Sequence, residues 1–149
     1  MNRIEIRQAR LSFEETYSVL IKGDKDFDPQ LSSVVDLTRY AQKLSKYAFF
    51  VLLEIDQRMM GCIAYYMNEE GRFIYISHFW VSCKWQRQHF GSQMLKDLIS
   101  LYGSSFREIR LEVRKNSPAF LFYKKEGFSV IEDHGKSFLL ALPLRQNAL

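Results

Sequence analysis

Apolar residues along this chain recur at two kinds of spacing, one typical of β-strands and the other typical of α-helices. Alternating apolar positions predict seven β-strands, at residues 2–8, 47–55, 59–67, 72–82, 107–113, 128–132 and 137–144. Spacings of three and four residues predict four helices, at residues 12–22, 36–44, 90–101 and 117–126. The resulting order, β-α-α-β-β-β-α-β-α-β-β, is typical of an α+β fold with a mixed, mostly antiparallel sheet flanked by helices.

Residues that begin or end helices support these boundaries. Ser12 opens a Ser-x-x-Glu capping box, and Asp36 stands where a second N-cap is expected. Gly103 and Gly127 follow the third and fourth helices, where glycine commonly ends a helix. The stretch at 72–82 is largely apolar on both faces, so we expect this strand at the centre of the sheet.

Composition limits the class of protein. With 149 residues and 47% apolar content, the chain is long enough for one domain over residues 1–149 with its own core. It has no apolar stretch of about 18 residues and no apolar segment near its start, which predicts neither a membrane span nor a signal peptide. Cys62 and Cys83 lack the spacing of a disulfide framework or a metal site. We therefore expect a cytoplasmic protein that binds no metal.

The positive charge is concentrated in one segment. The whole chain has a net charge of +4, whereas residues 81–125 alone contain nine Lys or Arg and three Asp or Glu, a net charge of +6. Such a segment predicts an anionic partner, either the phosphates of a cofactor or a nucleic acid.

The connection at 83–89 lies between a predicted strand and the helix that begins at Phe90. A helix N-terminus exposes unpaired backbone N–H groups that attract anions. Gly91 leaves room for a phosphate against the backbone, Ser92 offers a hydroxyl, and Lys84 and Arg87 add positive charge. These residues predict a site for a phosphate-bearing ligand.

Two segments resemble the Gcn5-related N-acetyltransferase (GNAT) superfamily. Gln86-Arg87-Gln88-His89-Phe90-Gly91 is similar to the family's acetyl-CoA motif, Q/R-x-x-G-x-G/A, except that His89 replaces the middle glycine. A left-handed backbone is more costly for histidine than for glycine, and the imidazole would stand where the pyrophosphate lies. The segment at 111–128 is similar to the family signature L-x-V…N…A…FY-x-K-x-GF, with Asn116 and Tyr123 at the family spacing.

The resemblance covers about residues 45–144 and implies a single GNAT-like domain over 1–149. It implies an acyltransferase that moves acetyl from acetyl-CoA to a primary amine by direct attack in a ternary complex. It also implies a splay between the fourth and fifth strands, where pantetheine inserts. A basic cofactor-binding segment explains the charge better than nucleic-acid binding does. The resemblance implies that the cofactor is bound by Phe79, Val81, Ser82, Cys83, Gln86, Arg87, Gln88, His89, Phe90, Gly91, Ser92, Asn116 and Tyr123.

Catalysis needs an acid and a base. Tyr123 resembles the family's general acid, because a phenol keeps its proton at pH 7 and can give it to a departing thiolate. Many relatives have a glutamate as base where this chain has Ser77. Three candidates remain for the base: Glu112 first, then a water relay through Ser77 and Tyr75, then His78. The alternative for Glu112 is a surface carboxylate paired with Arg110 or Arg114, and for His78 a core histidine.

The acceptor is expected to be a small-molecule or peptide amine, bound in an acidic and aromatic region whose aspartates Asp24, Asp26, Asp28 and Asp36 would attract a cationic amine. The resemblance places this region at Phe27–Val35, Tyr40, Glu54, Tyr65 and Tyr66. A nucleic acid or a membrane is not expected as partner. The strand at 137–144 is expected at an exposed edge, where it could pair in a homodimer. Two alternatives differ in class: a CoA-binding regulatory module with weak or lost catalysis, and a basic interaction domain that binds no CoA.

Overall fold

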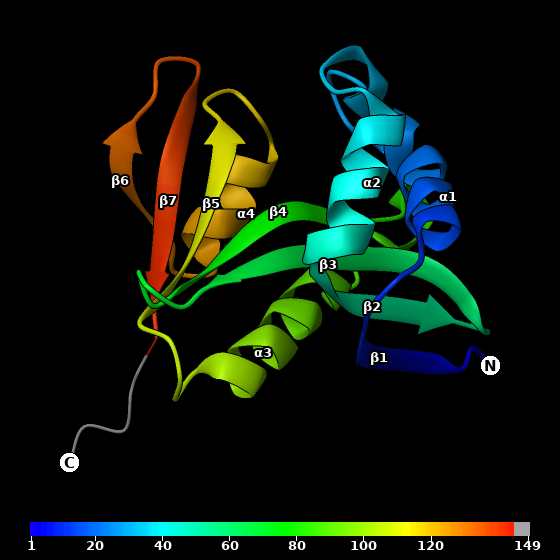
Figure 1. Ribbon diagram of the computed structural model, residues 1–149. Coiled ribbons are helices and arrows are strands. Elements are labelled where there is room, and N and C mark those ends of the chain that lie inside the picture. The colour runs from blue at the N-terminus through cyan, green and yellow to red at the C-terminus, as the bar shows by residue number, and fades with distance from the viewer. Residues whose placement is uncertain (145–149) are drawn as a thin grey trace. The chain divides into compact units, whose positions relative to one another are not determined.

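The computed structural model describes residues 1–144 and confirms the predicted order of helices and strands (Figure 1). The elements are β1 (Ile4–Ala9), α1 (Phe13–Gly23), η1 (Asp24–Asp26), η2 (Leu31–Ser33), α2 (Leu37–Tyr47), β2 (Phe49–Ile55), β3 (Arg58–Asn68), β4 (Phe73–Val81), η3 (Cys83–Trp85), α3 (Phe90–Tyr102), β5 (Glu108–Arg114), α4 (Ala119–Lys125), β6 (Ser129–Asp133) and β7 (Ser137–Pro143).

The two predicted caps begin α1 and α2. The Ser12 hydroxyl accepts a hydrogen bond from the N–H of Glu15, while the Glu15 carboxylate accepts one from the N–H of Ser12. The Asp36 carboxylate accepts from the N–H groups of Thr38 and Arg39. Each cap satisfies backbone donors that the helix leaves open, so these two boundaries follow from local sequence.

The strands form one mixed sheet in the order β1-β2-β3-β4-β5-β7-β6. β1 pairs antiparallel with β2, and β2 with β3. β4 pairs parallel with β5, from Phe73 beside Glu108 to Ile76 beside Leu111. The prediction that 72–82 forms a central strand is therefore confirmed. Its burial is one-sided, however: alternate residues from Ile74 to Trp80 are buried, while the residues between them are partly exposed.

β7 corrects the expectation of an exposed C-terminal edge. It pairs antiparallel with β5 on one side and with β6 on the other, so both of its edges are used. The reason is the β6–β7 hairpin, which places the earlier strand outside the later one (Figure 1). All five residues of β6 are exposed.

The chain divides into two compact units. Unit 1 comprises Met1–Tyr65 and His78–Asp97, and unit 2 comprises Tyr66–Ser77 and the chain from Leu98 onward. The interpretation of 1–149 as one domain stays a prediction. Within residues 1–144, no helix is long and apolar enough to cross a membrane.

Each unit has its own apolar core. In unit 1, helices α1 and α2 pack together (Figure 1), and the side chains with at most 1% exposure include Leu20, Leu44, Phe50, Leu52, Ile63 and Leu95. In unit 2, α4 packs beside β5, and the buried side chains include Ile74, Leu98, Ile109, Leu111, Phe128 and Leu140. These cores hold the two segments that carry the predicted chemistry, 77–92 and 111–128.

Candidate functional site

The loop between β4 and α3, in unit 1, is fixed by its own hydrogen bonds. The N–H of Ser82 donates to the carbonyl of Met60 (2.8 Å), and the N–H of Trp85 donates to the carbonyl of Ser82 (2.8 Å). The side-chain amide of Gln86 donates to the carbonyl of Val81 (2.8 Å). Gln86, the first residue of the predicted acetyl-CoA motif, therefore joins the loop back to the end of β4.

The backbone of this loop is left-handed at two residues, Arg87 (φ 64°) and His89 (φ 66°). Each such residue costs about 1–2 kcal/mol when it has a Cβ atom. The family motif has glycine where this chain has His89, a replacement that makes a left-handed backbone more costly, and the structure adopts that conformation nevertheless. Alternating backbone handedness turns successive N–H groups toward one point and forms an anion-binding concavity.

The start of α3 adds further donors to this loop. The carbonyl of His89 accepts from the N–H of Gln93 (3.0 Å), so the helix ladder begins there. The N–H groups of Phe90, Gly91 and Ser92 belong to the first turn, where a helix has no intrahelical acceptors for its donors. With the positive end of the helix dipole, they suit a negatively charged ligand.

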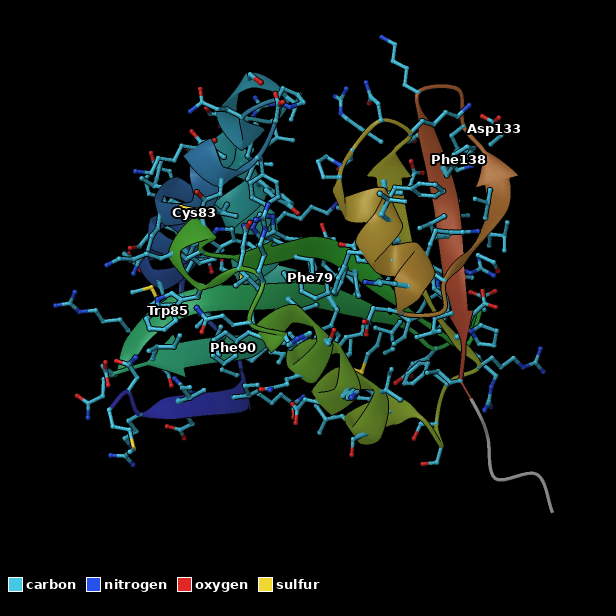
Figure 2. All side chains as sticks on the ribbon, turned by 180° about the vertical axis from the view of Figure 1, so that it is seen from behind. Phe79, Cys83, Trp85, Phe90, Asp133 and Phe138 are labelled. Carbon is cyan, nitrogen blue, oxygen red and sulfur yellow. The ribbon has the colours of Figure 1, made fainter. Side chains whose placement is uncertain are left out.

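The side chains of the loop divide by polarity. Lys84, Arg87 and His89 are exposed, while Phe90 is buried. The indole of Trp85 meets the edge of the Phe90 ring, with centroids 6.3 Å apart, and Figure 2 shows the two residues near the start of α3. The loop therefore has an apolar anchor and an outer surface of cationic and amide side chains. This donor set suits a diphosphate.

Two of the predicted cofactor-binding residues, Val81 and Cys83, already have a partner for one of their backbone groups. The carbonyl of Val81 accepts from Gln86, and the N–H of Cys83 donates to Oδ2 of Asp26 (3.2 Å). Asp26 also accepts from the indole N–H of Trp80 (2.9 Å). Asp26 was expected only among the acidic residues of the acceptor region. Its contact with Cys83, 57 residues further along the chain, has no signal in the sequence.

His78, on β4 in unit 1, is a buried histidine with 5% exposure. Its ring lies beside Phe27 (centroids 5.2 Å apart) and faces the edge of Tyr40 (6.0 Å). Among the described residues, its buried Nε2 atom has no hydrogen-bond partner. Burial lowers the pKa of His78 to about 4, so the imidazole is neutral at pH 7. A base with this pKa takes a proton from an ammonium group poorly.

Tyr123 lies on α4 in unit 2 and is 8% exposed. Its ring meets Phe122 and Phe128 in T-shaped contacts, with centroids 5.4 and 5.5 Å apart. Burial raises the pKa of its phenol well above the usual value. The phenol therefore keeps its proton at pH 7, which is the state that a general acid needs. Asn116 lies exposed in the turn between β5 and α4.

Three hydroxyl groups of unit 2 lie near one another, that of Tyr66 on β3 and those of Tyr75 and Ser77 on β4. Burial raises the pKa of Tyr66, and a hydrogen bond with Ser77 acts against that rise. Burial also raises the pKa of Tyr75, and the negative charge of Glu112 and the neighbouring Tyr66 add to it. Tyr66, which was expected in the acceptor region, therefore lies beside both Ser77 and Tyr75, the two residues of the predicted relay.

Glu112, the first-ranked base, is bound to two side chains of the β6–β7 hairpin. Its Oε1 lies 2.7 Å from Nδ1 of His134, and its Oε2 accepts from the hydroxyl of Ser137 (2.6 Å). These bonds, Ser137 before His134, lower the pKa of Glu112, against an opposing effect of burial. Glu112 is thus an exposed, paired carboxylate, with His134 and Ser137 as its partners, and Arg110, one of the two expected partners, pairs instead with Glu108 on its own strand.

Most acidic groups of the predicted acceptor region also have partners within unit 1. Asp24 accepts from the N–H and hydroxyl of Ser32 (2.7 and 2.8 Å), and Asp36 caps α2. Glu54 pairs with Arg7 (2.7 Å), and this hydrogen bond lowers the pKa of Glu54. Of these carboxylates, Glu54 has its charge offset by a cation, whereas the neutral donors of Asp24 and Asp36 leave their charge in place.

Comparisons with known proteins agree with this geometry. The model of the Acetyltransferase (GNAT) family matches residues 12–128. The structure resembles the PaiA N-acetyltransferase of Thermoplasma acidophilum, solved in complex with coenzyme A (TM-score 0.75, 18% identity, 95% of this chain and 99% of that one). It also resembles Tetrahymena Gcn5 (TM-score 0.71, 16% identity, 98% of each chain).

A third similar structure is the ribosomal-protein-S18-alanine N-acetyltransferase of Escherichia coli (TM-score 0.71, 18% identity, 99% of this chain and 97% of that one). At these identities the likeness to solved structures establishes the fold alone. A comparison with curated proteins finds no match. The family model, however, covers most of the sequence, including both segments that carry the motifs. The chain belongs to the GNAT acetyltransferase family.

Proposed function

We propose that this protein is an N-acetyltransferase that moves acetyl from acetyl-CoA to a primary amine of a small molecule or peptide. The observation that carries the proposal is the loop at 86–92. It combines two left-handed residues, the N–H groups of a helix start and exposed cations within one connection. A relative with the same fold was solved with coenzyme A, which supports the choice of ligand.

The chain's own residues supply binding and proton transfer. Acetyl-CoA supplies the acetyl thioester. In unit 1, the N–H groups from Gln88 to Ser92 bind the diphosphate, and Lys84 and Arg87 neutralise its charge. The N–H of Val81 is the proposed donor to the thioester oxygen. In unit 2, Tyr123 gives its proton to the departing thiolate. The two motif-bearing units thus have separate tasks, anion binding and proton donation.

The base is assigned to water held by the hydroxyl groups around Ser77. Both Glu112 oxygens have partners in the β6–β7 hairpin and the pKa of Glu112 is lowered, which makes it a weak proton acceptor. His78 is neutral at pH 7 but its low pKa makes it a weak base as well. In this relay, water between the hydroxyl groups of Ser77 and Tyr75 takes the proton from the amine and passes it on to bulk water, so neither Glu112 nor His78 has to accept it.

The cofactor assignment is tested by calorimetric titration with acetyl-CoA and with free CoA. The expected result is binding of both in the micromolar range, and absence of binding would overturn the assignment. Gly91→Glu places a carboxylate at the proposed phosphate position and should weaken binding at least about tenfold. Gln93→Glu adds the same charge at an exposed position of α3 and serves as the matched control.

Turnover is tested separately, by thiol release from acetyl-CoA with a panel of small amines and peptides. Thiol release that depends on an added amine supports the acetyltransferase. The engagement of Glu112 by His134 and Ser137 favours a second candidate, a CoA-binding regulatory module with weak or lost catalysis. CoA binding without turnover over the whole panel would select that candidate.

A further inference from the structure

One carboxylate oxygen in unit 1 accepts two hydrogen bonds at the point where β4 ends and the cofactor loop begins. Oδ2 of Asp26 accepts from the indole N–H of Trp80 (2.9 Å) and from the backbone N–H of Cys83 (3.2 Å). Trp80 is the last buried residue of β4, and Cys83 is the first residue of η3. Asp26 therefore contacts both sides of the junction between the strand and the loop.

The segment that contains Asp26 is itself held in place. Gly23, at the end of α1, lies against the Trp80 indole so closely that a Cβ atom there would stand 2.6 Å from the ring. Asp24 accepts two hydrogen bonds from Ser32, which close the connection between α1 and α2. Trp80 is 3% exposed. Asp26 is thus part of a fixed surface and not the end of a loose loop.

The cofactor loop needs such a support. Residues 86–89 are exposed, and Arg87 and His89 are left-handed, so few buried contacts stabilise a costly backbone. The bonds of Ser82 to Met60 and of Gln86 to Val81 join the loop to β3 and β4. Asp26 joins it to a segment 57 residues earlier in the chain.

The carboxylate of Asp26 cannot serve the cofactor loop through its charge. A negative charge beside a loop that binds a diphosphate lowers the affinity for that ligand. Its two accepted hydrogen bonds give this carboxylate a geometric task, which is to fix the direction in which the chain leaves β4.

We propose that Asp26 is a positioning residue for the cofactor loop, through which the α1–α2 connection controls the affinity for CoA. The proposal rests on the proposed function in so far as CoA is the ligand. Asp26 touches neither the cofactor nor the acceptor in this role. It acts through Trp80 and Cys83.

Two substitutions separate geometry from charge. Asp26→Asn removes the charge but keeps an oxygen that can accept both hydrogen bonds, whereas Asp26→Glu keeps the charge and displaces the carboxylate by one methylene. We expect Asp26→Glu to raise the calorimetric Kd for CoA about tenfold and Asp26→Asn to leave it within about threefold. Asp28→Glu, at an exposed position two residues further along, is the control and should bind as the unchanged protein does.

Other outcomes overturn the proposal. If Asp26→Asn binds CoA more tightly and Asp26→Glu is unchanged, Asp26 acts through its charge. If both variants bind as the unchanged protein does, the hydrogen bonds are only structural.

Trp80→Phe gives a second measurement, because it removes the indole donor, keeps an aromatic ring and leaves Trp85 as the single tryptophan. We expect this variant to bind CoA more weakly and Trp85 emission to change on titration. CoA affinity equal to that of the unchanged protein would contradict the proposal.

A readout without cofactor keeps this proposal distinct from the proposed function. Trypsin cleaves after Lys84 and Arg87, both exposed in the loop. If Asp26 positions the loop, cleavage at these two sites should be several-fold faster in Asp26→Glu than in Asp28→Glu. Equal cleavage would overturn the positioning role even if CoA binds. Faster cleavage in a protein that does not bind CoA would retain Asp26 as a support of the loop and reject only its ligand.

Discussion

The imidazole of His134 stands 2.7 Å from the carboxylate of Glu112, with Nδ1 facing Oε1. Its other nitrogen, Nε2, lies 2.8 Å from Glu132. Hydrogen bonds with the two carboxylates, Glu132 before Glu112, raise the pKa of His134. Lys115 adds an ion pair with Asp133 (2.6 Å) and lies over the ring of Phe138, and both partners are labelled in Figure 2. This network joins the β6–β7 hairpin to β5 and its following turn, and it gives Glu112 a structural role.

Glu112→Gln should therefore have a small effect on turnover. We expect kcat to stay within about threefold of its value in the unchanged protein. Removal of a general base would instead lower kcat about 10²–10⁴-fold. The free energy of unfolding should fall by about 0.5 kcal/mol, since the side chain is 39% exposed and solvent weakens its interactions. Thiol-release kinetics and urea unfolding measure the two effects, with Ser137→Ala as the matched variant of the same network. A hundredfold loss of kcat in Glu112→Gln alone would restore Glu112 as the base.

Features that depend on neighbours in sequence were predictable, and those that depend on distant partners were not. Ser12 and Asp36 cap helices within three residues of themselves, so their pattern is local. The left-handed backbone at His89 stands where the family motif has glycine, and the sequence indicated only that this conformation is costly for histidine. The partners of Glu112 lie 22 and 25 residues away, and hydrogen bonds at that separation leave no periodic signal in sequence.

The position of β7 in the sheet also depends on partners that are distant in sequence, and it could not be predicted for the same reason. The alternation at 137–144 predicts a strand, and the structure forms one over Ser137–Pro143. Alternation does not say which neighbour a strand takes, and the hairpin can place either of its strands against β5. Trp80 is a similar case, since its spacing predicts a buried residue but not the carboxylate of Asp26 that its indole N–H meets.

Tyr123→Phe tests the proposed general acid. The substitution keeps the ring contacts with Phe122 and Phe128 and removes only the phenolic oxygen. We expect kcat to fall about 10²–10⁴-fold while the Kd for acetyl-CoA stays nearly constant. Tyr102→Phe, on α3 of unit 2, is the control that removes a phenol elsewhere. Turnover unchanged in Tyr123→Phe would remove this residue from the mechanism.

His89→Gly tests the cost of the left-handed loop. Glycine adopts φ 66° without a Cβ penalty, which is about 1–2 kcal/mol for other residues, but it loses about 0.5–1 kcal/mol through the entropy of the unfolded chain. We expect a net gain of about 0.5 kcal/mol in the free energy of unfolding, with CoA binding equal or tighter. Gln88→Gly, at a neighbouring residue without positive φ, should lose stability instead. Weaker CoA binding by His89→Gly would mean that the imidazole itself contacts the ligand.

His78 predicts how stability depends on pH. Its pKa is about 4 in the folded protein and 6.5 in the unfolded chain, so the unfolded state holds more protons between these values. The free energy of unfolding should therefore fall as the pH drops from 6.5 to 4, by about 3 kcal/mol from this residue alone. His134 contributes in the opposite direction, because its pKa is raised, and His134→Gln removes that contribution. Urea unfolding over this pH range measures both. His78→Phe should remove this fall and leave the opposite contribution of His134. It should also raise stability at pH 7, since carbon against Phe27 replaces a buried nitrogen that has no hydrogen-bond partner among the described residues. A fall in stability that persists in His78→Phe would assign the acid sensitivity to other groups.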